Sequence, residues 1–507
     1  AIPAVYAGLA AAAIAIALAS PFTPPVADHF SGAGDFAGFA GGLTCAVLIS
    51  GPYLRKSGAF SISDLIGSRF QNPALSLGVA VIAAASALLA ALAGYEVALS
   101  GLTTIAGLSR PASAALVGFV LVLLAAPGGL SGVVWGAAAA AGVFIAAFVL
   151  PLAVLLLRGQ TLALPVLGDA DAWTAAMTRI SIWQGEVGQD ASLTLSLGMA
   201  LGLASCAPLL APMTAVRDRA AAVRAGLGAL TWGAVLAALI AATVAASTLG
   251  LLDAMVGRRP ERLPDSIYAA GATRLVATCK AAVATPAQAR TACQGAPNFN
   301  GVLRAEDIET RGLFLMTALP PLAAEGAALA GLVWAAVIAA GLVLAASGLL
   351  AAASALGNDA FHRVRDRAAL TSRRLAITRA ILVGSVAFAA ALAGAVELDP
   401  RILIGFALAL SAAGLAPLMA LALWPRARGV DAILALVSGV VVAEATLARG
   451  DISVQRLALA AVAGCFVALA VGVVASLFGG GERSHGRAFL AGLLRGDGDV
   501  LKPDKGA

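Results

Sequence analysis

The sequence predicts an all-α polytopic membrane protein with about twelve transmembrane helices, and three observations support this fold class. Sixty percent of the 507 residues are apolar and only 12% are charged, about half of the roughly 25% charged residues of a soluble domain. The mean hydropathy is +0.94. Apolar runs of about 20 residues, long enough to cross a hydrocarbon core of about 30 Å, recur along the chain. Runs such as AAAAIAIALA do not alternate polar and apolar residues, which excludes a β-barrel.

The apolar runs define the spans in order along the chain. They cover residues 2–20, 36–53, 74–107, 112–127, 133–157, 192–215, 225–251, 326–357, 375–396, 401–423, 430–448 and 456–478. The third and the eighth are long enough to tilt or to extend past the membrane. The first contains no Lys or Arg, unlike the start of a secretory signal peptide, so we expect it to be retained as a span.

Lys and Arg concentrate in one alternating set of loops. These residues are Arg55, Lys56, Arg69, Arg217, Arg219, Arg224, Arg363, Arg365, Arg367, Arg373, Arg374, Arg379, Arg426 and Arg428. Short cytoplasmic loops carry an excess of Lys and Arg. We therefore expect these loops and both termini in the cytoplasm, with the chain in a bacterial inner membrane. The net charge of +6 follows from these loops and does not indicate nucleic-acid binding.

The longest hydrophilic segment, roughly residues 252–325, falls on the opposite, periplasmic side in this topology. It contains Cys279 and Cys293, and disulfides form and persist in the periplasm. The other cysteines, Cys45, Cys206 and Cys465, lie within apolar spans. We therefore expect a disulfide between Cys279 and Cys293, with two free thiols in a flexible loop as the alternative.

Four motifs follow one another along the chain. They are GPYLRKSGAFSISDLIGSRF at residues 51–70, Gly128 and Gly129 followed by Trp135, LSLGMALGLASCAPLL followed by TAVRDRAAAVRAG, and AAASALGNDAF at residues 351–361. Their order and spacing resemble the sodium:solute symporter family, in its acetate-permease-like branch, and the tail RAFLAGLLRGDGDVLKPDKGA is similar to that branch as well. The resemblance covers nearly the whole chain.

The resemblance implies a leucine-transporter-like fold, in which two inverted five-helix repeats are followed by two additional helices. The expected division is 1–157 for the first repeat, 158–191 for a periplasmic connection, 192–424 for the second repeat with its periplasmic loop 252–325, 425–478 for the two additional helices, and 479–507 for a cytoplasmic tail. Many family members carry an extra helix before the core, and this chain is expected to lack it.

The same resemblance indicates where substrate and ion would bind. In such transporters the first helix of each repeat is interrupted near the midplane, and the freed backbone groups bind the cargo. This places a tentative substrate and ion site at Gly8 in the first helix and at Ser205 and Cys206 in the sixth. Tyr95 and Glu96 of the third span and Ser347 of the eighth would complete it.

Glu96 is the one carboxylate in the middle of a predicted span whose presence packing alone does not explain. An intramembrane acid is costly unless it is paired, hydrated or protonated, and it therefore indicates function. A proton-coupled carrier needs such a group. The alternative is that a long, tilted helix brings Glu96 to the outer interface, where water solvates it.

The chain departs from the family where sodium would bind. Sodium-coupled relatives carry paired hydroxyl residues at the positions that correspond to Val343 and Leu344, and aliphatic side chains supply no oxygen ligand. The sequence therefore predicts a depleted ion site, no metal other than a doubtful sodium ion, and no cofactor. The coupling ion is sodium or a proton.

The charged stretch at residues 51–70 is expected to form a cytoplasmic turn and a short helix with Asp64 near its start, where the helix dipole favours an anion. Arg55, Lys56 and Arg69 are expected at the level of the lipid headgroups. The stretch is interpreted as a marker of topology and fold rather than as a binding site.

Two functions from different classes remain. The first is a cation-coupled transporter that takes up a small monocarboxylate such as acetate. The second is a transport-inactive membrane subunit or scaffold with the same fold, whose partners would be other membrane proteins. Lipids surround the chain in both cases. No motif indicates an enzyme, and FGGGER lacks the Lys-Ser/Thr of a phosphate-binding loop.

Overall fold

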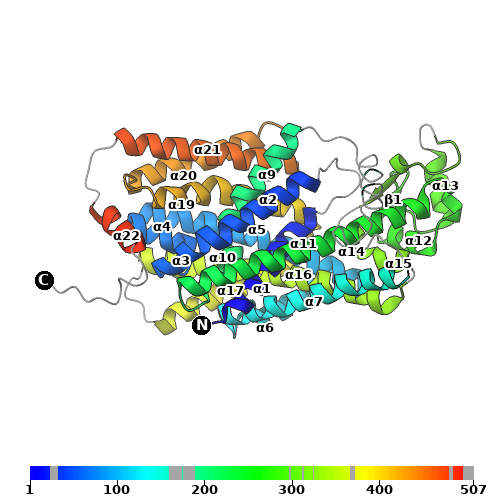
Figure 1. Cartoon of the computed structure of the whole chain (residues 1–507), viewed down its shortest axis with the longest axis horizontal. Coiled ribbons are helices and arrows are strands. Elements are labelled where there is room, and N and C mark those ends of the chain that lie inside the picture. Colours follow the sequence, from blue (N-terminus) through cyan, green and yellow to red (C-terminus); the bar gives the residue numbers. More distant parts are fainter. Residues whose placement is uncertain are drawn as a thin grey trace.

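The computed structural model of the chain shows an elongated bundle whose helices run mostly along its long axis (Figure 1). It describes residues 1–22, 32–158, 174, 178, 189–273, 275–295, 299–310, 313–323, 325–365, 371–478 and 484–494. Within these residues, 10 helices are long and apolar enough to cross a membrane, and two shorter apolar helices, Ala4–Ala19 and Arg110–Ala125, accompany them. Together they coincide with the predicted spans. Most of the predicted connection 158–191 and of the tail 479–507 lies outside the described residues.

The first half of the bundle contains five spans. They are α1 (Ala4–Ala19), which ends in the 3-10 turn η1 (Ser20–Phe22); α2 (Gly32–Thr44) with the π-helical stretch η2 (Cys45–Ser50) and α3 (Gly51–Ser57); α5 (Pro73–Ala106); α6 (Arg110–Ala125); and α7 (Gly129–Leu157). A short helix, α4 (Ile62–Phe70), lies between α3 and α5. Asn72 caps α5, because its side chain accepts hydrogen bonds from the N–H groups of Ala74 and Leu75 ahead of the first apolar turn.

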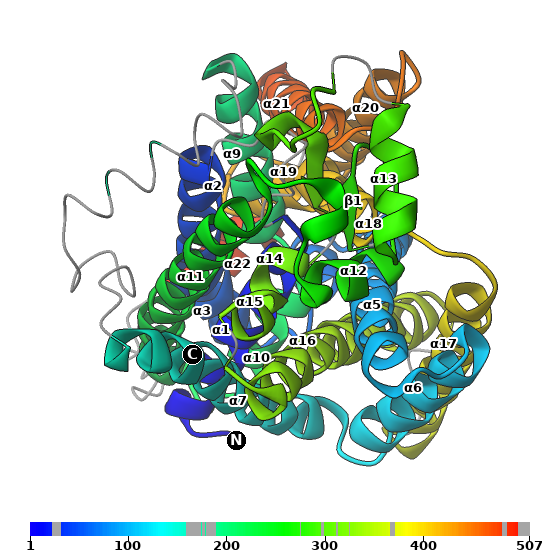
Figure 2. The ribbon, with the colours of Figure 1, turned by 90° about the vertical axis from the view of Figure 1, so that its right-hand side faces the viewer.

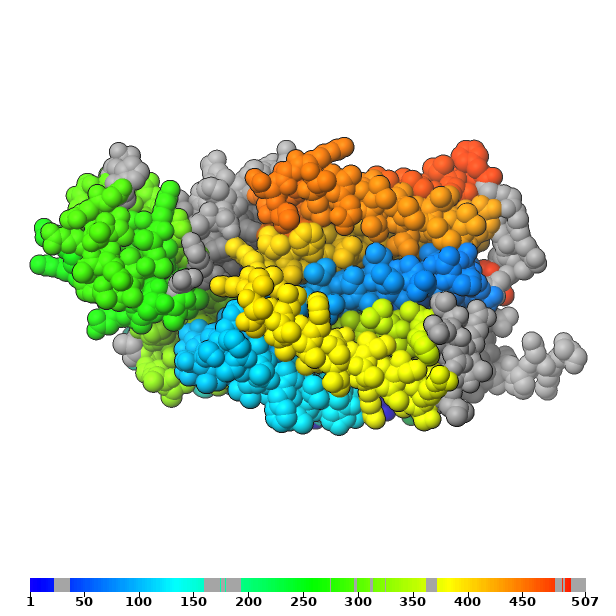
Figure 3. All heavy atoms as spheres, turned by 180° about the vertical axis from the view of Figure 1, so that it is seen from behind, coloured from blue at the N-terminus to red at the C-terminus, as the bar shows by residue number. Residues whose placement is uncertain are grey.

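The second half contains the remaining spans. They are α9 (Gln189–Ala204) with α10 (Ala207–Thr214); α11 (Arg219–Met255); α16 (Ala327–Ser354) with the π-helical stretch η5 (Ala355–Arg365); α17 (Thr371–Ala395); α18 (Pro400–Leu410) with the π-helical stretch η6 (Ser411–Leu415) and α19 (Ala416–Ala422); α20 (Gly429–Leu447); and α21 (Val454–Phe478). The helix α22 (Ser484–Leu494) contacts α3 and α4. Seen from behind, α17 lies against α6, yellow against cyan (Figure 3).

Small residues allow the central helices to approach closely. The most extensive contact in the bundle joins α5 and α16. A Cβ atom on Gly341 would lie 2.4 Å from the backbone nitrogen of Ala98, and one on Gly94 would lie 2.6 Å from that of Ala345. Glycine is therefore required at both positions, as is common where membrane helices pack backbone against backbone.

A subdomain with its own core caps one end of the bundle, and we call this the disulfide end. It contains η3 (Pro260–Arg262), α12 (Asp265–Ala272), β1 (Val276–Thr278), α13 (Pro286–Gln294), η4 (Ala305–Asp307), β2 (Ile308–Thr310), α14 (Phe314–Thr317) and α15 (Leu319–Leu322). The strands pair antiparallel, with Ala277 opposite Glu309. Viewed from this end, α12, α13 and β1 lie in front of the bundle (Figure 2). The subdomain adds a small sheet to a fold that was expected to be entirely helical.

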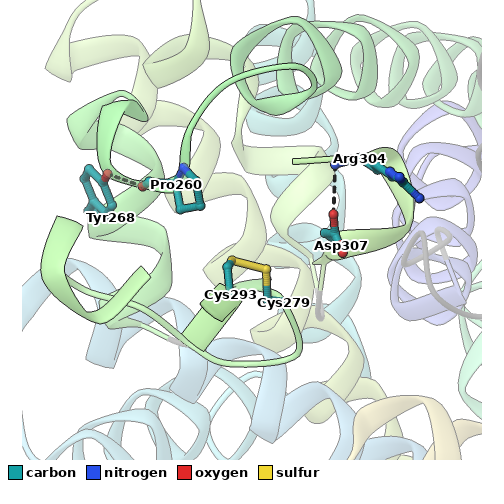
Figure 4. Close-up of a disulfide and its surroundings, with 6 residues drawn as sticks. All are labelled: Pro260, Tyr268, Cys279, Cys293, Arg304 and Asp307. Carbon is teal, nitrogen blue, oxygen red and sulfur yellow. Dashed lines mark hydrogen bonds between the residues drawn. A yellow bond between two sulfur atoms is a disulfide. The ribbon is translucent and has the colours of Figure 1, made fainter. Parts of the chain in front are cut away.

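Cys279 and Cys293 form a disulfide within this subdomain, as the sequence predicts (Figure 4). Local hydrogen bonds order the chain around it. The hydroxyl of Tyr268 donates to the carbonyl of Pro260 at 2.7 Å, and the N–H of Arg304 donates to the carboxylate of Asp307 at 2.9 Å. We call the opposite end of the bundle, which holds residues 51–72, 215–218 and 423–428, the arginine-rich end (Figure 1).

Candidate functional site

The sixth span is broken where the sequence predicts an interruption. α9 ends at Ala204 and α10 begins at Ala207, so Ser205 and Cys206 lie between two helical segments. Pro208 has no N–H to donate to the carbonyl of Ala204, which would be its partner in a continuous helix. The N–H of Leu209 bonds to the carbonyl of Cys206 at 3.1 Å rather than to that of Ser205. The carbonyls of Ala204 and Ser205 therefore lose their helical donors inside the bundle.

Buried serines from three other spans surround this break. The hydroxyl of Ser50, at the end of η2, donates to the carbonyl of Ala204 at 2.8 Å. The hydroxyl of Ser205 donates to the carbonyl of Ser411, at the start of η6, at 3.0 Å. The hydroxyls of Ser411 and Ser86 lie 2.7 Å apart. The break thus sits in a polar cluster, flanked by two π-helical stretches of the kind that often mark functional sites.

Ser50, Ser86 and Ser411 were not predicted from the sequence as site residues. Each is a single hydroxyl residue in an otherwise apolar span, and that was the available signal. Nothing in the sequence shows that the second, third and tenth spans turn these hydroxyls toward the same break. The cluster is a property of the tertiary packing.

A cavity of about 640 Å³ lies next to α10, toward the arginine-rich end. One wall is α10 itself, from Ala207, the first residue after the break, to Thr214. The others come from the turn before α7, the end of α16 with η5, the first turns of α17 and the segment between α3 and α4. The volume is in the range of pockets that bind small molecules, about 300–1,000 Å³. The cavity therefore connects the second half of the broken helix to one end of the bundle.

A hydrogen-bonded network forms the polar wall of this cavity. The hydroxyls of Ser61 and Ser63 both donate to Oδ2 of Asp359, which is buried in η5. The amide of Asn358 donates to Oδ1 of Asp359 at 2.8 Å, and the guanidinium of Arg374 donates to the side-chain oxygen of Asn358. The stretch at residues 51–70 is thereby joined to the eighth and ninth spans. It contributes to the wall of the cavity, a role that was not predicted from the sequence.

The short helix α4 forms as expected, and one of its charged side chains, Arg69, is buried. Asp64 is in the first turn, where its N–H bonds to the hydroxyl of the N-cap Ser61 at 3.0 Å. Arg69 was expected at headgroup level, and the structure shows that its side chain is enclosed by protein, because Arg69 is 3% exposed. Its guanidinium donates to the carbonyls of Ala422, Trp424 and Ala427, and its burial lowers its pKa. The carbonyl groups at the end of α19 provide this buried cation with acceptors that the sequence does not reveal.

The predicted interruption of the first span at Gly8 is absent. Helix α1 is continuous from Ala4 to Ala19, and a Cβ atom on Gly8 would lie 2.7 Å from the carbonyl oxygen of Ala225 in α11. Gly8 thus serves close helix packing, and the strong helix propensity of the surrounding alanines favours continuity. Of the two expected breaks, only the one at Ser205 and Cys206 is present in the described residues.

The other predicted site residues make separate contacts. The hydroxyl of Tyr95 donates to the carbonyl of Ala114 in α6, and that of Ser347 donates to the carbonyl of Leu344 in its own helix at 3.1 Å. Cys206 is buried beside Ser205 at the break. Within the described part of the chain, no hydrogen bond joins two of the six predicted residues.

Glu96 has a cationic partner that the sequence analysis did not identify. Nη2 of Arg110, at the start of α6, lies 2.6 and 2.7 Å from the two carboxylate oxygens. The same nitrogen donates to the carbonyl of Val396 at 2.7 Å. Glu96 is thus paired, and the pair ties the third and fourth spans to the end of the ninth. Its assignment to ion coupling stays a prediction.

The positions of the expected sodium ligands are occupied by hydrocarbon. Val343 and Leu344 are 4% and 1% exposed and belong to the main apolar core, as does most of α1. No group of three or more His, Cys, Asp or Glu side chains that could hold a metal occurs among the described residues. The ion ligands of this region would have to be backbone carbonyls and serine hydroxyls.

The bundle with one broken span has the leucine-transporter fold. A Na⁺-coupled sialic acid symporter, solved in a substrate-bound outward-open state, matches 95% of this chain and 91% of its own with a TM-score of 0.68 at 14% identity. The nucleobase-cation-symport-1 family transporter Mhp1 matches 96% of each chain with a TM-score of 0.50 at 14% identity. At these identities the likeness establishes the fold alone.

The comparison of sequences is more limited. No family model matches the chain. An uncharacterized symporter of Cupriavidus necator is 29% identical over 147 residues, which are 29% of this chain and 22% of that protein. The match therefore spans about a fifth of the length of this curated relative.

Proposed function

We propose that the protein is a secondary active transporter of the symporter type, which couples the uptake of a small monocarboxylate such as acetate to a sodium or proton gradient. The observation that carries the proposal is the break at Ser205 and Cys206, because the cavity begins at Ala207 directly after it. A helix broken inside a membrane, with a cavity leading from the break, is what a carrier uses to bind cargo. The symporters of the same fold support the class of activity.

The proposal includes an orientation. The arginine-rich end and both termini would face the cytoplasm of a bacterial inner membrane, and the disulfide end would face the periplasm. The division into two five-helix repeats, two additional helices and a tail, as the sequence predicts, belongs to the same proposal. The cavity then opens toward the cytoplasm, which corresponds to an inward-facing state.

Transport by the purified protein in liposomes tests the proposal. Radiolabelled acetate should accumulate when an inward sodium or proton gradient is imposed, and the accumulation should vanish when an ionophore collapses that gradient. Separate gradients of the two ions identify the coupling ion. Uptake equal to that of protein-free liposomes under both gradients would refute the proposal.

A second candidate is a transport-inactive membrane subunit that keeps the fold as a scaffold for other membrane proteins. It is favoured by the continuous helix α1 and by the aliphatic residues Val343 and Leu344 at the expected ion site. The liposome experiment separates the two candidates, because a scaffold neither accumulates substrate nor exchanges it across the membrane.

A further inference from the structure

Among the described residues, three charged side chains line the cavity beside α10: Asp359, Arg374 and Arg379. The one carboxylate of the described lining is already hydrogen-bonded through both oxygens, because Asp359 accepts from Ser61, Ser63 and Asn358. Such bonds stabilise the charge and occupy the lone pairs that a cationic ligand would need. The described lining therefore carries an excess of positive charge.

Arg379 is the charged side chain of the described lining for which no described residue is a partner. It makes no hydrogen bond or ion pair with another described residue, whereas Arg374 donates to Asn358. Both arginines belong to one stripe of α17 that faces the cavity. The stripe consists of Arg374, Leu375, Thr378, Arg379 and Leu382. This spacing is that of one face of a helix.

The start of α7 adds a second source of positive potential. Gly128, Gly129 and Leu130 line the cavity at the N-terminus of α7, and no side chain caps this helix start. The first N–H groups of a helix carry a partial positive charge, which favours a nearby anion. Most of the remaining lining is apolar and includes Leu210, Ala211 and Leu350.

We propose that this cavity is a binding site for a short-chain monocarboxylate. The carboxylate of the ligand pairs with the guanidinium of Arg379, and its hydrocarbon part lies against the apolar wall. Guanidinium groups suit carboxylates because two parallel hydrogen bonds can form. A cavity of about 640 Å³ has room for chains longer than acetate. The choice of a carboxylate rests on the proposed function, but the binding itself does not require transport.

The test is equilibrium binding of radiolabelled butyrate to the full-length protein in phosphatidylcholine nanodiscs. The variant Arg379→Gln should weaken binding by about tenfold, the effect of losing a hydrogen bond to a charged group. Arg379→Lys keeps the charge and should weaken binding much less. Arg373→Gln is the matched control, because Arg373 belongs to the same helix and does not line the cavity; its binding should equal that of the wild type.

Competition identifies the ligand chemistry. Each added methylene from acetate to butyrate should tighten binding by about fourfold, from a transfer free energy of about 0.8 kcal/mol for each buried CH₂. Inorganic phosphate should compete poorly, because it cannot use the apolar wall. Nanodiscs that also contain phosphatidylglycerol should bind butyrate equally well; loss of binding there would show that a lipid headgroup is the ligand and would overturn the assignment.

Other outcomes separate this inference from the proposed function. The proposed binding site is refuted if Arg379→Gln binds butyrate as well as the wild type does, or if the wild type does not bind it. This holds even if liposomes accumulate acetate. Butyrate binding that depends on Arg379, without any gradient-driven uptake in liposomes, would support the proposed binding site and refute the proposed transport function.

Discussion

At the scale of single residues, the ion pair between Glu96 and Arg110 connects three spans near the disulfide end. Glu96 is 4% exposed and Arg110 is 27% exposed in their side chains. Removing one partner of a buried pair leaves the other charge uncompensated, which costs about 3–5 kcal/mol when the pair is fully buried. The partial exposure of Arg110 reduces this cost.

We expect Glu96→Gln to lower the free energy of unfolding by about 1–3 kcal/mol, and Arg110→Gln to lower it by a similar amount. The double variant should lose less free energy of unfolding than the sum of the two single losses. Denaturation of the purified variants measures this coupling. Additive effects would show that the pair contributes nothing. An altered pH dependence of uptake in a Glu96→Gln protein of unchanged stability would assign Glu96 to ion coupling instead.

Arg69 supports a second prediction at this scale. Its guanidinium donates at 3.0, 3.2 and 3.4 Å to three carbonyls around the end of α19. Lysine keeps the charge but cannot reproduce the planar fork of donors. Arg69→Lys should therefore lower the free energy of unfolding by about 2 kcal/mol. Arg426→Lys, at an exposed position of the neighbouring loop, is the matched control and should change nothing. Equal stability of the two variants would contradict the capping role.

At the scale of elements, the broken sixth span provides a direct test of the site. Pro208→Ala restores an N–H that can bond to the carbonyl of Ala204, and alanine favours a continuous helix. We expect the variant to be folded, at least as stable as the wild type, and impaired in uptake by about tenfold or more. Pro212→Ala changes the same residue type within α10 rather than at the break and serves as the control. Wild-type uptake by Pro208→Ala would remove the break from the mechanism.

The disulfide subdomain can be tested independently of the bundle. A bond between Cys279 and Cys293 closes a short loop and is expected to contribute about 3 kcal/mol to the stability of this subdomain. Cys293→Ser should therefore make residues 252–325 more susceptible to limited proteolysis while the membrane spans stay protected. Mass spectrometry of the unreduced wild type should show neither thiol alkylated; free alkylation of both would contradict the bond.

The elements also show which parts of the structure could be predicted from the sequence. The third span was expected at residues 74–107 and is helical from Pro73 to Ala106, because length and hydropathy alone define a span. The break at Ser205 was predictable from the nearby glycines and prolines. The serine cluster around it was not, since side chains from four spans meet only after packing. The burial of Arg69 was missed for the same reason.

At the scale of the whole molecule, the two ends of the bundle should lie on opposite sides of the membrane. A cysteine at Ser57, the last residue of α3, reports on the arginine-rich end, and a cysteine at Ala287 in α13 reports on the disulfide end. In intact cells, a membrane-impermeant maleimide should label Ala287→Cys and reach Ser57→Cys only after permeabilisation. Labelling of Ser57→Cys from outside would reverse the proposed orientation and move the cavity to the periplasmic face.

The contact between α5 and α16 limits how the molecule can move. Gly94 and Gly341 lie directly against backbone atoms of the facing helix, which leaves little room for the two helices to slide past each other. We therefore expect α5 and α16 to move as one unit, together with the cavity wall at Leu350 and Ala351 of α16. If the proposed transport takes place by alternating access, we expect the cavity to widen and narrow by displacement of α10 and α3. Because α10 is the second half of the broken helix, a substrate bound at the break would then move together with the element that opens its passage.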